Sequence, residues 1–364
     1  MFEPIDTMTP PEHPDYIKDF PAARFFSTKQ SFVWWWYMFL FKENGVRKQI
    51  IAFWTTKTYP DVTVNGESWG PAAHLSGKPE SFSYNGMTTW WYWDGERFHE
   101  TIPKVSRYEN SCSPDEFEIT SEDVHHTCSR DEFSLRFCRN PEDFDLRVES
   151  STPTPPPVGY KRTLLTKKMG FDALKVYSAP FKGTLSTDGN TRQIEGSYYM
   201  QNITLNSPAV PWLWGVFHKD DGSYLTHFSS FLGPLMVRRI KEGKPKWDNK
   251  FRLLNKNLNY TPKGQETKRF KHVRYNVTRD EHDLPLFEIT GELGEEKLRV
   301  LIKTISKTTY SFERKRFWKN KFFYNEFPSE ILSIDYTDAE GIVHHDDGSE
   351  WTGNSEYSWG ILLA

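Results

Sequence analysis

Short runs of apolar and aromatic residues, separated by turn residues, recur along most of the chain. The first clear run, Trp34 to Phe41, leads into Asn44-Gly45, and a second apolar run continues from Arg47 to Thr56. Asn and Gly tolerate positive φ, so this dipeptide between two apolar runs predicts a β-hairpin.

The same turn signal recurs between later runs, and no long amphipathic stretch carries helix caps. The further turn signals are Asp94-Gly95, Asp188-Gly189, Asp221-Gly222, Gly294, Glu340-Gly341 and Asp347-Gly348. Short strands joined by tight turns at this density indicate an antiparallel meander. We therefore expect an all-β protein with two antiparallel barrels or sandwiches packed around an apolar pocket.

The chain has 364 residues, which is typical of about two domains. Residues 1–24, rich in Pro and acidic groups, predict an extended lead-in. Thr152 to Pro157 reads as a loop, because Pro cannot donate to a sheet ladder. The polar segment Lys241 to Lys250 suggests a domain boundary, giving an N-terminal domain over 25–240 and a C-terminal domain over 241–364.

Charge gives little reason to expect a nucleic-acid partner, because 46 basic and 49 acidic residues leave a net charge of −3. The basic stretch Lys315 to Lys321 could contact RNA or an anionic head group, but a solvated strand face is favoured. Three Cys and the lack of a signal-like N-terminus predict a reducing, cytoplasmic location. The longest apolar run, Phe32 to Phe41, is too short for a bilayer span, which takes about 20 residues. Peripheral membrane contact and the oligomeric state stay open.

Aromatic residues make up 16% of the chain and favour both strands and ligand pockets. In a strand, Trp34 and Trp36 face one way, and Trp35 and Tyr37 face the other. Both faces are thus apolar. Either the strand is simply buried, or one of its faces lines a ligand cavity.

Two other segments combine aromatic and polar residues. Tyr199 and Gln201 share one strand face, and Trp212, Trp214 and His218 share another. These could line an apolar pocket with few polar groups, or they could belong to a barrel core.

Near the C-terminus, Glu356 lies close to Tyr357 and Trp359. A buried carboxyl there would have a raised pKa and could donate a proton. An exposed Glu at a strand end is the commoner alternative.

Other chemistries lack support in the sequence. The Cys and His residues between Cys112 and Cys138, and the segment His344 to Asp347, lack the spacing of common zinc sites. Nucleotide-binding and hydrolase motifs are also missing. We expect no metal and no cofactor.

Several segments, taken in order from about 31 to 360, resemble the carotenoid 1,2-hydratase (hydroxyneurosporene synthase) family and its lipocalin-like relatives, which include tocopherol cyclase. The matching segments are Trp34-Trp35-Trp36-Tyr37, Tyr177-Ser178-Ala179-Pro180, Gly183-Thr184-Leu185, Gly196 with Tyr199, and Trp212-x-Trp214-Gly215 with the Asp221-Gly222 hairpin. The chain departs from the family pattern in three respects: Trp34 replaces an expected Glu, Gln201 replaces an expected Asp, and the family's His and Trp-Gly that follow this Asp are not in register.

The resemblance implies two tandem lipocalin-like barrels and acid-initiated hydration or cyclisation of an isoprenoid or polyene. Because the amide of Gln201 cannot supply a proton, the expected acid is Glu356 or Asp94. Tyr199 and Gln201 would then position water or a polar end of the substrate. The expected aromatic walls and neighbouring substrate contacts are Trp35, Trp36, Tyr37, Tyr177, Trp212, Trp214, His218, Tyr357 and Trp359. A non-catalytic carrier of a hydrophobic small molecule or lipid, and a structural protein with solid barrels, are the alternatives.

Overall fold

The computed structural model describes residues 32–57, 62–69, 76–78, 81–100, 103–113, 116–129, 132–140, 143–151, 158–163, 170–205, 210–232, 252–315 and 319–360. Over these ranges the chain forms strands, turns and short connections, and no helix long and apolar enough to span a bilayer is found there. The expected lead-in, the Pro-rich loop and the segment Lys241 to Lys250 lie outside the described residues.

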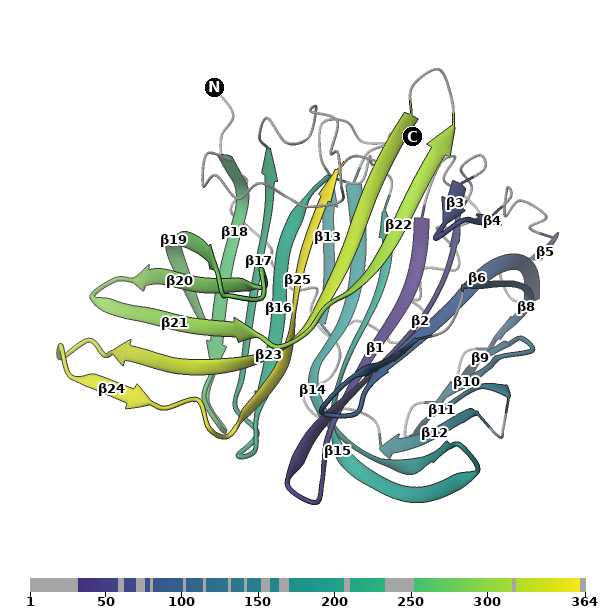
Figure 1. Cartoon of the computed structure of the whole chain (residues 1–364), viewed down its shortest axis with the longest axis horizontal. Helices are drawn as coiled ribbons and strands as arrows, with labels where there is room; N and C mark the ends of the chain where they lie inside the picture. Colours follow the sequence, from purple (N-terminus) through teal and green to yellow (C-terminus); the bar gives the residue numbers. More distant parts are fainter. Residues whose placement is uncertain are drawn as a thin grey trace.

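The strands form two antiparallel sheets, each of which curls into a closed barrel, so the all-β prediction of two barrels is confirmed (Figure 1). The first sheet has 13 strands and closes through pairing of β12 with β14. Its strands are β1 (Phe32–Glu43), β2 (Val46–Lys57), β5 (Ser76–Lys78), β6 (Ser81–Trp93), β7 (Phe98–Glu100), β8 (Lys104–Cys112), β9 (Glu116–Thr120), β10 (Val124–Ser129), β11 (Glu132–Asn140), β12 (Phe144–Ser151), β13 (Val158–Thr163), β14 (Gly170–Thr187) and β15 (Asn190–Leu205).

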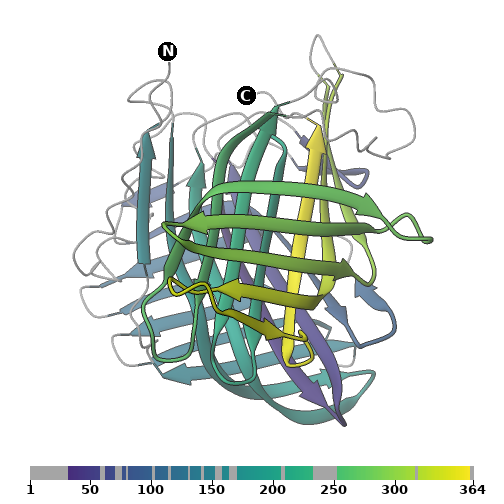
Figure 2. The ribbon, with the colours of Figure 1, turned by 90° about the vertical axis from the view of Figure 1, so that its left-hand side faces the viewer.

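The second sheet has 12 strands and closes through pairing of β21 with β23. Its barrel lies beside the first in Figure 1 and in front of it in the view turned by 90° (Figure 2). Its strands are β3 (Val62–Val64), β4 (Glu67–Trp69), β16 (Trp212–Lys219), β17 (Tyr224–Leu232), β18 (Arg252–Thr261), β19 (Lys268–Arg279), β20 (Pro285–Leu293), β21 (Glu296–Thr304), β22 (Thr308–Lys315), β23 (Lys319–Thr337), β24 (Val343–Asp346) and β25 (Trp351–Gly360).

Two predicted hairpins show why the turn dipeptides mark strand ends. Asn44 and Gly45 join β1 to β2 with φ values of 52° and 78°. Asp188 and Gly189 join β14 to β15 with φ values of 51° and 73°. Positive φ at both positions matches the twist of paired strands, so these sequences set the register on either side.

The chain passes from the first sheet to the second at an earlier residue than the sequence suggested. β15 ends at Leu205 in the first sheet, and β16 begins at Trp212 in the second. The strands β16 and β17 therefore pair with the C-terminal half of the chain, whereas a boundary near residue 240 would have placed them in the N-terminal domain. The Asp221-Gly222 hairpin looks like those before it, so local pattern could not reveal the change of sheet.

One short hairpin from the N-terminal part of the chain pairs with the second sheet. β3 pairs with β22 through Val64 and Phe312, and β4 follows at the edge. The Asn65 amide donates to the carbonyl of Ser311 over 3.0 Å, and the Ser311 amide donates to Asn65 Oδ1 over 2.8 Å. The two halves of the sequence are thus joined by backbone pairing as well as by packing.

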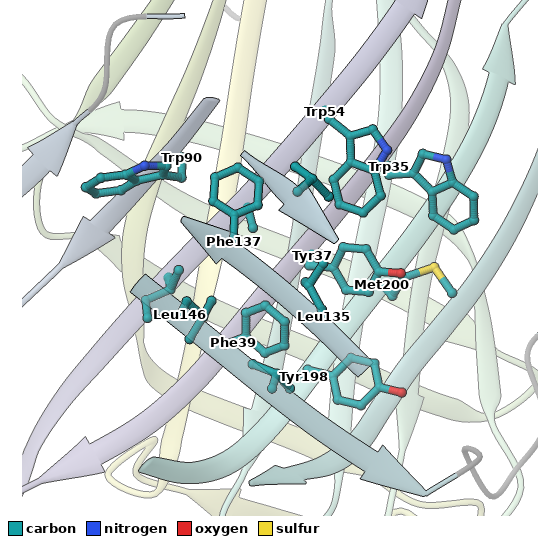
Figure 3. Packing of buried hydrophobic residues seen from close by; sticks show 14 of the residues in the cluster. Trp35, Tyr37, Phe39, Trp54, Trp90, Leu135, Phe137, Leu146, Tyr198 and Met200 are labelled. Carbon is teal, nitrogen blue, oxygen red and sulfur yellow. The ribbon is translucent and has the colours of Figure 1, made fainter. Parts of the chain in front are cut away.

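Aromatic side chains fill much of each barrel. In the first barrel, Trp35, Tyr37 and Phe39 of β1 point inward and pack with residues from the opposite wall (Figure 3). At their centre the buried His126 shares a hydrogen bond of 3.0 Å with the Tyr37 hydroxyl. A separate cluster fills the second barrel, and a third lies between the two sheets. Burial of this much aromatic surface is the main stabilising contribution.

Candidate active site between the barrels

The third cluster joins the outer faces of β1 and β16. Because side chains alternate along a strand, Trp36 lies on the opposite face of β1 from Trp35 and Tyr37. The ring centroids of Trp36 and Trp214 are 5.3 Å apart with an interplanar angle of 85°, and Tyr199 contacts both rings. The two aromatic walls expected from the sequence therefore meet, one contributed by each sheet.

A pair of buried glutamates lies on the second-barrel side of this contact. Glu326 of β23 and Glu356 of β25 are directly opposite each other in the antiparallel pairing, with 0% and 3% of their surface exposed. Two carboxylates in this position would repel each other. The pair is therefore stable only if its negative charge is reduced.

The hydrogen bonds around the two glutamates indicate that one of the carboxyls is protonated. The Tyr324 hydroxyl lies within hydrogen-bonding distance of Oε1 of Glu326 and, at 2.8 Å, of Oε1 of Glu356. A tyrosine has one hydroxyl proton and can donate it to only one of them. The second contact is a hydrogen bond if the other carboxyl is protonated and donates to the tyrosine oxygen.

The other oxygen of each carboxyl faces a nitrogen donor. Trp212 Nε1 donates to Glu356 Oε2, and Asn354 Nδ2 donates to Glu326 Oε2. Indole and amide N–H groups only donate, so each Oε2 atom is already used as an acceptor. This arrangement favours an Oε1 atom, beside Tyr324, as the position of the shared proton.

Burial raises the pKa of both glutamates. It is the main cause that raises the pKa of Glu356 from 4.5 to about 7, against hydrogen bonds from Trp212 and Tyr324. Burial, and then the neighbouring charge of Glu356, raise the pKa of Glu326 well above its usual value. At neutral pH the pair holds at least one proton, as in other paired carboxyls.

The first barrel contributes polar groups to the same region. Gln49 Nε2 donates to Asn354 Oδ1 over 2.9 Å and so connects β2 with the glutamate pair. Tyr199 donates to Gln201 Oε1 over 3.1 Å. Lys175 of β14 is opposite Gln201 in the pairing with β15, and burial, partly offset by the charge of Glu356, lowers its pKa to about 8.

His218 connects the two barrels at another point. Its Nε2 lies 2.8 Å from the Tyr177 carbonyl oxygen, and its Nδ1 lies 2.7 Å from Ser197 Oγ. A carbonyl only accepts, so Nε2 carries the proton and the serine hydroxyl donates to Nδ1. Burial lowers the pKa of His218 to about 4, so this ring is neutral at pH 7.

A surface hollow of about 1420 Å³ lies on the Ser197 and His218 side of the barrel contact. Its lining also includes Phe41, Pro180 and Glu195, but neither of the paired glutamates. The hollow and the acid pair are therefore separate features.

Apart from His218, described above, and Asp94, described below, the predicted site residues fall into three groups. Trp36, Tyr177, Trp212, Trp214 and Tyr199 belong to the cluster between the sheets, and Gln201 and Glu356 lie beside it. Strand alternation directs the others into the barrels, so they are not walls of this site: Trp35 and Tyr37 lie in the first barrel, and Tyr357 and Trp359 lie in the second.

Asp94 does not have the properties expected of a proton donor. It accepts hydrogen bonds from the amides of Glu96 and Arg97 in its own turn and pairs with His99. Partial burial favours the neutral acid, but these bonds outweigh it and lower the pKa of Asp94 to about 2. At neutral pH this residue is a carboxylate, so it cannot be the proton donor.

Sequence reasoning missed Glu326 and Tyr324. Both lie on one face of the apolar run Phe322-Phe323-Tyr324-Asn325-Glu326-Phe327, and an acid inside such a run is an available signal of a buried carboxyl. Its pairing with Glu356 follows from the register of β23 and β25, which the sequence does not specify. Within the described residues, no three His, Cys, Asp or Glu side chains gather as a metal site would require.

The architecture is that of a tandem lipocalin-like protein with two closed β-barrels. Among solved structures, it is similar to a protein of Nitrosomonas europaea provisionally described as AttH, with a TM-score of 0.54 and 13% identity over 90% of this chain and 92% of that one. A weaker likeness, with a TM-score of 0.42 and 11% identity, links it to kievitone hydratase of Nectria haematococca, covering 91% and 89% of the two chains. No family model and no curated protein matches the sequence. The likeness to the Nitrosomonas protein supports the fold alone.

Proposed function

We propose that this protein binds a hydrophobic isoprenoid or polyene between its barrels and catalyses acid-assisted hydration or cyclisation of a double bond. The observation that carries the proposal is the directly opposed, buried pair Glu326 and Glu356 beside aromatic rings, where burial raises the pKa of both acids. A general acid needs a pKa near the working pH, and the raised pKa of Glu356 meets that requirement.

The proposed reaction begins with transfer of the shared proton from an Oε1 atom to one alkene carbon. The π electrons form the new C–H bond, and the neighbouring carbon becomes a cation while the pair gains a negative charge. Water then adds to the cation, or a second double bond of the same molecule attacks it. Loss of a proton from the adduct to the carboxylate completes hydration or cyclisation and restores the pair.

Aromatic rings around the acids are suited to stabilise such a cation. Trp212 is held at the acid pair by its bond to Glu356, and its ring centroid lies 5.9 Å from that of Tyr324. An aromatic face near a cation contributes roughly 0.5–2 kcal/mol, with the larger values in desolvated sites. Trp36 and Trp214 extend this aromatic surface toward the first barrel.

Lipid that co-purifies with the protein would be identified by mass spectrometry and then incubated with fresh protein in water enriched in oxygen-18. Hydration gives a product heavier by one labelled water, whereas cyclisation gives an isomer of unchanged mass. We expect Glu326→Gln and Glu356→Gln each to lower turnover by roughly 10²-fold or more. Glu330→Gln, on the same strand β23 but outside the pair, is the matched control.

The outcomes separate catalysis from carriage. Turnover at the wild-type rate in both glutamine variants would refute the proposal. Saturable binding of the lipid, with quenched tryptophan fluorescence and no product, would favour the non-catalytic carrier instead.

A further inference from the structure

Lys175 is placed toward the acid pair by strand alternation. Its neighbours Leu174 and Val176 are buried, and Val176 belongs to the core of the first barrel, so Lys175 points to the outer face of that barrel. Gln201 is opposite Lys175 on β15, and Trp36 is opposite Gln201 on β1. These three side chains form a row across the first sheet that faces Glu356 on the second.

The side-chain nitrogens of Lys175 and Gln201 in this row can donate hydrogen bonds to a ligand. Gln201 accepts the Tyr199 hydroxyl through its oxygen, so its amide nitrogen remains available to donate. Across the described part of the chain, no carboxylate lies within ion-pair distance of Lys175 and no acceptor is bonded to its ammonium group. The ammonium interacts with Glu356 through its charge, and Lys175 is only partly exposed.

A partly buried ammonium group without an ion-pair partner is costly, and an anionic oxygen of a ligand would offset that cost. The proton that Glu326 and Glu356 share reduces the negative charge that the pair presents to Lys175. The lowered pKa of Lys175, about 8, still leaves it protonated at pH 7.

We propose that Lys175 and the amide of Gln201 form the polar end of the inter-barrel site and bind a carboxylate at the end of an apolar ligand. The inference rests on the site of the proposed function and specifies its ligand as an apolar chain with one anionic oxygen group. The chain would lie along Trp36 and Trp212 and present a double bond to the acid pair. A neutral polyene hydrocarbon would leave both donors unused.

The test compares two probes that differ at one end group: cis-parinaric acid, which carries a carboxylate, and its uncharged methyl ester. Both contain a fluorescent polyene, and energy transfer from tryptophan reports their binding to the full-length protein. We expect the acid to bind wild-type protein about tenfold more tightly than the ester, because a bond between charged partners is lost with the ester. Lys175→Met should abolish this preference, and Lys175→Arg should keep most of it.

Two controls address nonspecific effects. Lys182→Met removes an exposed lysine from the same strand and should leave both affinities unchanged. Far-UV circular dichroism would verify that each variant keeps its strands. Gln201→Glu supplies a second independent perturbation, since an added carboxylate should weaken the acid more than the ester.

Equal affinity of acid and ester for the wild type, or a preference that survives Lys175→Met, would overturn the inference while leaving an apolar site intact. Failure of both probes to bind would overturn the inference and also weaken the proposed function. Turnover of a co-purified neutral lipid, unaffected by Lys175→Met, would refute the inference and leave the acid pair as the catalyst.

Discussion

Replacement of Glu356 by Gln should change how stability depends on pH. The folded state raises the pKa of Glu356 from 4.5 to about 7, chiefly by burial. The folded protein therefore binds the proton more tightly than the unfolded chain does. Below pH 4.5 the carboxyl is protonated in both the folded and the unfolded state, and its stabilising contribution is fully present. This contribution decreases as pH rises from 4.5 through 7.

The size of the effect follows from the two pKa values. One pKa unit corresponds to about 1.4 kcal/mol, so this carboxyl should reduce the free energy of unfolding by roughly 3 kcal/mol between pH 4.5 and pH 8. Glutamine remains neutral across this range, and its oxygen can still accept from Trp212. The variant should lack this decrease.

Buried histidines change stability in the opposite direction. Burial lowers the pKa of His126 and His227 to about 3 and that of His218 to about 4. The unfolded chain binds protons more tightly at these groups, so they raise stability as pH rises toward 6.5. The difference between wild type and variant removes the contribution of the histidines. It reports the loss of Glu356 together with the change that this loss causes at the paired Glu326.

The assay is urea denaturation of wild type, Glu356→Gln and the control Glu330→Gln at several values between pH 4.5 and pH 8. The free energy of unfolding of the glutamine variant, relative to wild type, should increase with pH. Parallel profiles for wild type and Glu356→Gln would refute the reasoning, because they would mean that Glu356 has an ordinary pKa in the folded protein.

Three further substitutions test the contacts between and within the barrels. Tyr324→Phe should lower the free energy of unfolding by about 1–3 kcal/mol in denaturant titration, because both carboxyls lose a buried partner, and unchanged stability would contradict the shared-proton arrangement. His218→Ala should cost a similar amount, because Ser197 and the Tyr177 carbonyl lose their bonds across the barrel contact; a thermal midpoint equal to wild type would show that these bonds contribute nothing. Gly215→Ala should destabilise by about 1–3 kcal/mol, since the added methyl overlaps the buried His227 ring, and normal stability in calorimetry would show that the ring can move aside.

Local sequence was sufficient to predict the class of fold. Asn44-Gly45 and Asp188-Gly189 fix hairpins through backbone conformations that few other residues adopt, and alternation separates Trp35 from Trp36. These are short-range effects, so they can be read within a few residues. The contact between Trp36 and Trp214 could also be predicted, because the sequence segments that contain these residues are too apolar to face water.

Long-range pairing limited what could be predicted about the site. On β25, Glu356 faces the barrel contact and Tyr357 faces inward. Which of the two faces is inward depends on the sheet that this strand joins. Glu326 becomes a partner of Glu356 only through the register of β23. Asp94 looked equivalent to Glu356 in sequence, but the turn that follows it supplies N–H donors that keep it ionised.

The pairing of the β3–β4 hairpin with β22 has a consequence for the order of folding. Asn65 and Ser311, which bond to each other, are 246 residues apart in sequence. During synthesis the hairpin leaves the ribosome long before its partner strand exists. Contacts at such separation close slowly, because the intervening chain must first be ordered. The edge of the second sheet should thus be among the last parts to form, and the hairpin is an exposed strand pair that a chaperone could bind in the interval.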